Sequence, residues 1–79
     1  MKIAEVIWDD AVMNHEFMSI EGIDDMKPER RSNVGYLTRE DDACVVLSSG
    51  ILYDGIERYD ANMFITKGMI IKIRILEDD

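Results

Sequence analysis

The sequence predicts a mainly β domain, and three observations carry this prediction. Short runs rich in β-branched and aromatic residues recur along the chain, and acidic or glycine-containing turns separate them. A single segment has the three-residue apolar spacing of a helix. The chain has 79 residues without a repeat, a linker or a low-complexity stretch, so we expect one domain covering residues 1–79.

The first half of the chain predicts a strand, a long loop and a second strand. Residues 2–8 are β-branched and partly alternating, and the two aspartates after them are expected to end this strand. In the loop that follows, Ser19 is a suitable N-cap for one or two helical turns that end before Pro28. Residues 33–38 then predict the second strand. Gly35 within it indicates a bend or a close backbone approach.

The second half predicts a tight hairpin and two further strands. The acidic turn at residues 40–42 leads into residues 43–48, whose unbroken apolar run is typical of a strand covered on both sides. Residues 49–62 form a looser stretch punctuated by glycines, and residues 63–66 are a short fourth strand. A tight connection at Lys67 and Gly68 precedes the fifth strand at residues 70–76.

The fifth strand has the clearest alternation, so we expect Ile71, Ile73 and Ile75 to face the core. Five short strands at this spacing can close into a barrel, which removes the exposed edges of an open sheet. The sequence therefore predicts a small five-stranded SH3-like or Sm-like barrel with a short helix in the first long loop. An open α+β sheet with one helix across a face is the alternative.

Composition limits the compartment and the class of partner. Seventeen acids against nine bases give a net charge of −8, which disfavours nucleic acids and anionic membranes as partners. The chain has a single cysteine and no apolar run near the length of about 18 residues that a membrane span needs, so we expect a cytoplasmic protein in a reducing compartment. A domain this small often gains stability by association, and we expect a homo-oligomer.

Residues suited to catalysis or to metal binding are sparse. His15 is the only histidine and lies in a loop, while Cys44 lies in an apolar strand without a neighbouring cation that would activate it. The paired acids do not follow the spacing of a calcium loop, and the glycines do not form a phosphate-binding motif. We therefore expect no enzyme activity, no metal and no cofactor.

Aromatic residues interleaved with arginines are the most informative binding signal. Aromatic faces can stack on a base, and guanidinium groups can hold a phosphate. The candidate ligand-binding residues are Trp8, Tyr36, Arg39, Tyr53, Arg58 and Tyr59. The ordinary alternative is that Trp8 and Tyr36 belong to the core and that the arginines neutralise nearby acids.

A second group of residues predicts a protein contact. Met13, Met18 and Met26 lie with Phe17 in the first long loop, and methionine adapts to irregular apolar surfaces. We expect these side chains to fill a subunit interface. The alternative is a soft surface that binds another protein.

Several short segments follow one another in a distinctive order along the chain. Trp8 and Asp9 precede a variable loop; Val-Gly-Tyr-Leu at residues 34–37, an acidic turn and Val-Val-Leu at residues 45–47 follow, and an Ile-rich strand closes the chain. In this order the segments resemble short uncharacterised accessory proteins of tailed phages and prophages. The resemblance implies a phage-encoded accessory role in the host cytoplasm. The methionine-rich loop departs from the pattern.

These observations favour a non-catalytic binding protein. One expected target is a small anionic, nucleotide-like molecule, such as an immune signal, sequestered in pockets between the subunits of a homo-oligomer. The second expected target is a host protein, inhibited through the acidic and apolar surface. A structural or regulatory phage component is the third alternative.

Overall fold

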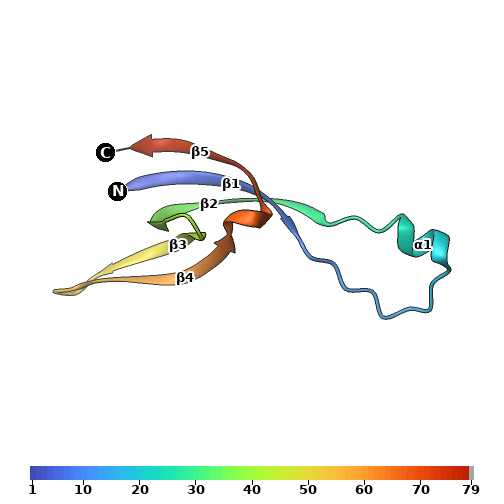
Figure 1. The fold of residues 1–79 in the computed structure, drawn as a ribbon. Coiled ribbons are helices and arrows are strands. Elements are labelled where there is room, and N and C mark those ends of the chain that lie inside the picture. Colours follow the sequence, from blue (N-terminus) through green and yellow to red (C-terminus); the bar gives the residue numbers. More distant parts are fainter. Residues whose placement is uncertain (79) are drawn as a thin grey trace.

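The computed structural model describes residues 1–78 of the chain. It contains one antiparallel five-stranded sheet, so the predicted mainly β class is confirmed (Figure 1). The elements in chain order are β1 (Lys2–Asp10), α1 (Ile20–Asp24), β2 (Glu29–Glu40), β3 (Cys44–Tyr53), β4 (Glu57–Thr66), the 3₁₀ turn η1 (Lys67–Met69) and β5 (Ile70–Asp78).

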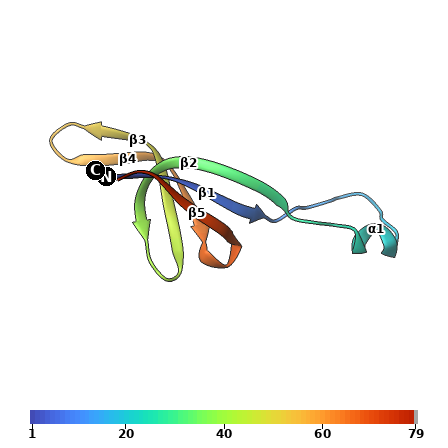
Figure 2. The same cartoon turned by 90° about the horizontal axis from the view of Figure 1, so that it is seen from above.

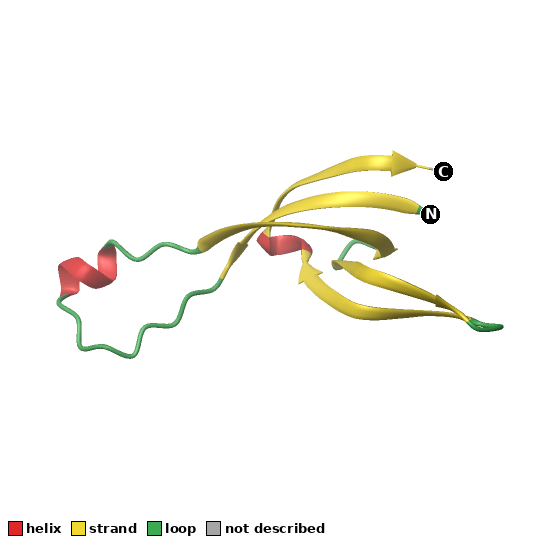
Figure 3. Ribbon diagram, turned by 180° about the vertical axis from the view of Figure 1, so that it is seen from behind, coloured by secondary structure: helices red, strands yellow, loops and turns green. Residues whose placement is uncertain are grey.

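The sheet is open rather than a closed barrel. Its strand order is β4-β3-β2-β1-β5, so β4 and β5 are its two edges. Nor does a helix cross a face of the sheet, because α1 lies at the far end of the long β1–β2 loop (Figure 3). Within residues 1–78, the structure therefore has neither the closure of the predicted barrel nor the helix packing of the alternative.

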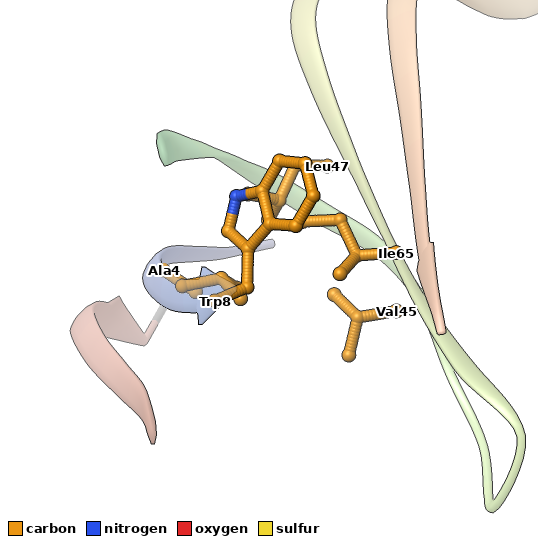
Figure 4. Packing of buried hydrophobic residues seen from close by; sticks show 6 residues of the cluster. Ala4, Trp8, Val45, Leu47 and Ile65 are labelled. Atoms are coloured by element: carbon orange, nitrogen blue, oxygen red, sulfur yellow. The ribbon is translucent and has the colours of Figure 1, made fainter. Parts of the chain in front are cut away.

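The core lies on one face of the sheet, around Trp8. In a flat sheet β1 and β4 would lie about 14 Å apart, three strand spacings, yet Trp8 and Ile65 belong to one buried cluster. The sheet therefore curls around this face, and Figure 4 shows the Trp8 indole against Leu47, near Ile65 and Val45. The indole Nε1 donates a hydrogen bond of 2.8 Å to Oδ1 of Asn33. The buried apolar cluster comprises Ala4, Val6, Trp8, Val45, Leu47 and Ile65.

Gly35 allows β2 and β3 to approach closely, as its position predicts. A Cβ atom at this residue would lie 2.9 Å from the carbonyl oxygen of Ser48 and 3.3 Å from Cβ of Leu47. Backbone cannot move aside as a flexible side chain can, so a larger residue here would push the two strands apart.

The first two strands are longer than predicted, because ion pairs neutralise the aspartates at their end. Asp9 lies opposite Arg30 in the β1–β2 register, and the Arg30 Nε and Nη2 atoms donate hydrogen bonds of 2.9 and 3.1 Å to its carboxylate. Arg31 Nε lies 3.0 Å from the carboxylate of Asp10. Cross-strand pairs of opposite charge stabilise a sheet, so the expected end of the strand at residue 8 is wrong.

The looser stretch expected at residues 49–62 is instead a long hairpin. The β3–β4 register is regular from Cys44↔Thr66 to Tyr53↔Glu57, and a three-residue turn with Gly55 at φ 102° joins the strands. Gly50 belongs to β3, where the carboxylate of Asp60 lies directly over it. Gly50 therefore marks a close approach rather than the end of a strand.

The expected orientation of β5 is only partly correct. A register shift between Ile7 and Trp8 places Ile70 opposite Trp8, and Ile70 and Ile73 pack against the core. Ile71 is 53% exposed and Ile75 is 41% exposed, so neither is a core residue. Because of this bulge, Ile70 packs against the core in place of Ile71, which strict alternation along the strand could not predict.

The molecule is elongated. Its extents are 56 × 23 × 19 Å and its radius of gyration is 16.2 Å, whereas a compact domain of this length would have about 12 Å. Two protrusions cause the elongation. We call residues 11–28, which carry α1, the apolar arm, and residues 50–60 the hairpin tip. They extend from opposite ends of the curled sheet (Figures 1 and 2).

The helical turn of the apolar arm is built as the sequence predicts. Ser19 is the N-cap of α1, and its Oγ accepts a hydrogen bond of 3.1 Å from the backbone N–H of Gly22. The helix ends at Asp24, and none of its residues is buried. It therefore leaves its apolar side chains facing solvent.

Candidate functional site

Three of the six candidate ligand-binding residues come together at the hairpin tip. In the β3–β4 register Leu52 lies opposite Arg58, Ile51 opposite Tyr59 and Tyr53 opposite Glu57. Because side chains alternate along a strand, Tyr53 and Tyr59 share one face and Arg58 points to the other. The structure thus brings two aromatic rings and one guanidinium group to the tip of the β3–β4 hairpin, with the rings on one face and the guanidinium group on the other.

A shallow hollow lies on this hairpin. Its volume is about 360 Å³, and its walls are mostly apolar. The residues that line it are Gly50, Ile51, Leu52, Arg58, Tyr59 and Asp60. Apolar walls with a few polar groups are typical of small-molecule sites.

The hairpin tip is nevertheless acidic. Asp54, Glu57 and Asp60 against Arg58 give residues 50–60 a formal charge of −2. Arg58 forms an ion pair with Asp54, and the hydroxyl of Tyr59 donates a hydrogen bond of 2.8 Å to Glu57. This hydrogen bond, together with burial and the charge of Glu57, raises the pKa of Tyr59 above its ordinary value. An anion bound here would have to compete with these carboxylates for Arg58.

The other three candidates lie apart from the tip. Trp8 is a core residue, so its ring is not free to stack on a ligand. Tyr36 is half-buried in β2, where it lies opposite Ile3 and Ser48. Arg39 lies at the other end of the β3–β4 hairpin, beside Phe64, which is about 20 Å from Arg58 along β4.

Arg39 forms an aromatic–cation pair that the sequence did not reveal. Its guanidinium carbon lies 5.8 Å from the centroid of the Phe64 ring, and that side chain is 59% exposed. Phe64 lies opposite Val46 in the register of the long hairpin. The pairing follows once residues 49–62 are recognised as strand, which is the signal that sequence reasoning missed.

Asp41 organises the turn between β2 and β3. Its Oδ1 accepts hydrogen bonds from the backbone N–H groups of Ala43 (2.8 Å) and Cys44 (3.0 Å), and its Oδ2 accepts one from Nε of Arg39 (2.8 Å). These three bonds favour the ionised carboxylate and lower the pKa of Asp41 to about 2. The arrangement is that of a structural turn, as the paired acids of this segment predict.

Cys44 is fully buried, and burial raises the pKa of its thiol above the ordinary value. A protonated, inaccessible thiol is a poor nucleophile. Within the described residues, no group of three or more His, Cys, Asp or Glu side chains is placed to hold a metal ion. Among residues 1–78, neither α1 nor η1 has the length and apolar character needed to cross a bilayer.

A second hollow, with a volume of about 390 Å³, lies at the base of the apolar arm. It is lined by Asp9, Lys27, Pro28 and Arg30. Arg30 already forms an ion pair with Asp9, so the ammonium group of Lys27 is the charge that this hollow could offer to a ligand. One exposed lysine is a weak basis for a ligand site.

The apolar arm leaves its large apolar side chains unpacked. Phe17 is 108% exposed and Met13 is 79% exposed, so their side chains contact almost nothing. The predicted interface residues Met18 and Met26 are also exposed, and the structure adds further apolar side chains to the set. The additional ones are Val12, Ile20 and Ile23.

Comparison with known proteins gives no relative. The chain matches no protein-family model, no curated protein and no solved structure.

Proposed function

We propose that this chain is a non-catalytic binding protein that acts as a homo-oligomer and sequesters a small anionic, nucleotide-like ligand at sites between subunits. The observation that carries the proposal is the excess surface of the single chain. A compact chain of 9.1 kDa would expose about 4,900 Å², whereas this one exposes 5983 Å². The excess of about 1,100 Å² exceeds the roughly 800 Å² that each partner buries in a standard interface.

The hairpin tip supports the ligand class. Tyr59 lines the hollow together with Arg58, and stacking of a base on an aromatic side chain is worth about 1–3 kcal/mol. Arg58 supplies one guanidinium group, but the net charge of −2 opposes a phosphate. The hollow at the tip is shallow and would need a second copy to enclose a ligand, so we place the ligand between subunits.

We also infer that the fold is an opened relative of an SH3-like or Sm-like barrel. In such a barrel the first strand lies between the second and the fifth, as β1 does here. A 3₁₀ turn leads into β5, and the curled face of the sheet carries the core. The strand order and the curl support this inference.

The biological setting we propose is a phage infection. The resemblance of residues 34–51 and of the ends of the chain to short phage accessory proteins supports this setting. Sequestering a nucleotide in the host cytoplasm would remove a signal that the host uses for immunity. Such a role requires stoichiometric binding and no catalysis.

A thermal-shift screen against linear and cyclic nucleotides tests the ligand. A ligand at 100 times its Kd stabilises the folded state by about 2.7 kcal/mol, so we expect one nucleotide to raise the Tm clearly. Arg58→Ala should abolish this rise, and the control Arg39→Ala, at the far end of the hairpin, should retain it. The ligand proposal fails when no nucleotide raises the Tm, or when Arg58→Ala responds like the wild type.

One observation favours inhibition of a host protein as a second candidate. The apolar arm combines exposed apolar side chains with four acids and one lysine. Such a surface fits a partner with a basic rim and an apolar centre. This candidate predicts that the protein purifies from host lysate with one host protein and that nucleotides leave its Tm unchanged.

A further inference from the structure

We propose that the apolar arm of one copy covers the hairpin tip of a second copy, in a two-fold dimer whose long axes run antiparallel. The proposal rests on the homo-oligomer of the proposed function and is independent of its ligand. It names the two surfaces that meet and the way they meet.

The position of the two protrusions carries the geometry. The apolar arm and the hairpin tip extend from opposite ends of the molecule in all three ribbon views (Figures 1 to 3). A two-fold axis across the long dimension turns a second copy end for end. Each arm then meets the tip of the other copy, and the same contact forms twice, as an isologous interface requires.

The chemistry of the two surfaces matches. The hairpin tip exposes Leu52 (55%), Tyr53 (72%) and Ile56 (76%), and the apolar arm exposes Phe17 completely. Neither set has a partner surface within its own chain, because the two lie at opposite ends. Large apolar side chains left exposed in this number on a small protein are typical of protein interfaces.

The area available suits a second copy of the same chain. The excess of about 1,100 Å² over a compact monomer accompanies the elongated shape, and an antiparallel dimer would bury both protrusions. A larger, unrelated partner contacting one end would leave the other protrusion exposed. A second copy covers both ends at once.

The sheet edges are poorer sites for a second copy. Suppose that β5 of one copy paired antiparallel with β5 of another. A pairing centred on residue 72, 73 or 74 would then place Lys72 or Arg74 opposite a cation of the other copy. On the other edge, Ala61 in β4 has φ 48°, which interrupts the regular backbone that an added strand needs. The apolar protrusions remain as the favoured contact.

Electrostatics gives the dimer a recognisable salt dependence. The apolar arm carries Glu16, Glu21, Asp24 and Asp25 against Lys27, a formal charge of −3, and the hairpin tip carries −2. Two acidic surfaces repel each other at low ionic strength, and salt screens this repulsion. The dimer should therefore tighten as salt is added, whereas a contact made by ion pairs would weaken.

Position-specific crosslinking between two copies tests the proposal. Phe17→Cys and Ile56→Cys are made in separate preparations, mixed, allowed to exchange and treated with a short bis-maleimide crosslinker. Cys44 is fully buried, so the wild type serves as an unreactive control. Both substitutions lie at exposed positions, and circular dichroism shows whether each variant keeps the sheet.

We expect covalent dimers in the mixture and few in either preparation alone, because the two copies of residue 17 lie at opposite ends of the dimer. Equal crosslinking of Phe17→Cys with itself, or no dimer in the mixture of folded variants, overturns the proposal. Crosslinking without any nucleotide-dependent rise in Tm would leave this interface standing and reject the ligand instead.

Discussion

The curled half of the sheet and the two protrusions follow opposite rules of packing. In the curled half, Ala4 and Val6 are completely buried, and alternation along β1 directs every second side chain to the core. In the apolar arm and the hairpin tip, Phe17 and Ile56 are exposed although they are as apolar as any core residue. The difference teaches that this chain has two apolar sets, one packed in the core and one exposed to solvent, and we propose that the exposed set serves association.

The two regions also differ in how their polar groups are paired. In the curled half, Ser48 is buried, and its hydroxyl donates a hydrogen bond of 2.6 Å to Oδ1 of Asn62 and lies 2.9 Å from the hydroxyl of Thr38. At the hairpin tip, the polar contacts are exposed pairs such as Arg58 with Asp54. Exposed pairs of this kind contribute little stability. Changes in the two regions should therefore have unequal effects.

The largest effect is expected at the centre of the core. Trp8→Ala removes the indole that contacts Leu47 and its hydrogen bond to Asn33, and truncating a buried Trp costs about 3–5 kcal/mol. For a domain of this size we expect the variant to be mostly unfolded, as measured by far-UV circular dichroism in urea. A cooperative transition with the wild-type midpoint would show that the Trp8 cluster is not the core.

A smaller loss is expected where β2 and β3 approach each other. Gly35→Ala adds a Cβ 2.9 Å from the carbonyl oxygen of Ser48, and overpacking of this kind costs about 1–3 kcal/mol. Gly68→Ala is the matched control, since no atom lies within 4 Å of the added Cβ. Urea denaturation of both variants measures the difference, and equal midpoints would contradict the close approach.

A still smaller, pH-dependent effect is expected at Asp41. Its pKa is about 2 in the folded state against an ordinary value of 3.8, so its contribution is fully present above the ordinary value and is lost as the pH falls toward 2. Asp41→Asn should destabilise the protein at pH 7 and flatten the loss of stability between about pH 4 and pH 2.

The neighbouring Asp42→Asn is the control for this titration. It removes the same formal charge but none of the three hydrogen bonds that Asp41 accepts. Across this pH range, the Tm of Asp42→Asn should fall with decreasing pH as steeply as the Tm of the wild type. Equal slopes for both variants would mean that the turn does not depend on Asp41.

The smallest effect on the stability of a single chain is expected in the apolar arm. Phe17→Ala removes a side chain that is fully exposed in the single chain. At low protein concentration the free energy of unfolding should therefore change by no more than about 0.5 kcal/mol, as for other surface substitutions. The wild-type Tm should rise with protein concentration through dimer formation, and the variant should lose most of this rise. A variant that melts early at every concentration would place Phe17 in the core.

The sequence predicted the β class, the N-cap at Ser19, the buried run at Cys44 and the close approach at Gly35 from local rules. It failed at residues 49–62, because glycine is ambiguous between a turn and a close approach in a strand. Gly50 proves to be the second case, through Asp60. Closure of the sheet depends on contacts between distant strands, which local periodicity does not encode.

The candidate site was predictable only in part. Tyr53, Arg58 and Tyr59 could be named as residue types, but their grouping depends on the β3–β4 register, which the sequence interpretation did not contain. Trp8 was ambiguous between a stacking surface and a core residue, and the curl of the sheet places it in the core. The exposure of Phe17 could not be predicted from the sequence either, since an apolar loop residue can pack against its own sheet.

The most direct test of the central claim is the mass of the wild-type protein in solution, measured by size-exclusion chromatography with light scattering over a range of concentrations and salt. We predict an even multiple of 9.1 kDa that persists at high salt, and a shift toward the monomer for Phe17→Ser combined with Ile56→Ser. A mass of 9.1 kDa at every concentration would contradict the claim that a second copy covers the apolar arm.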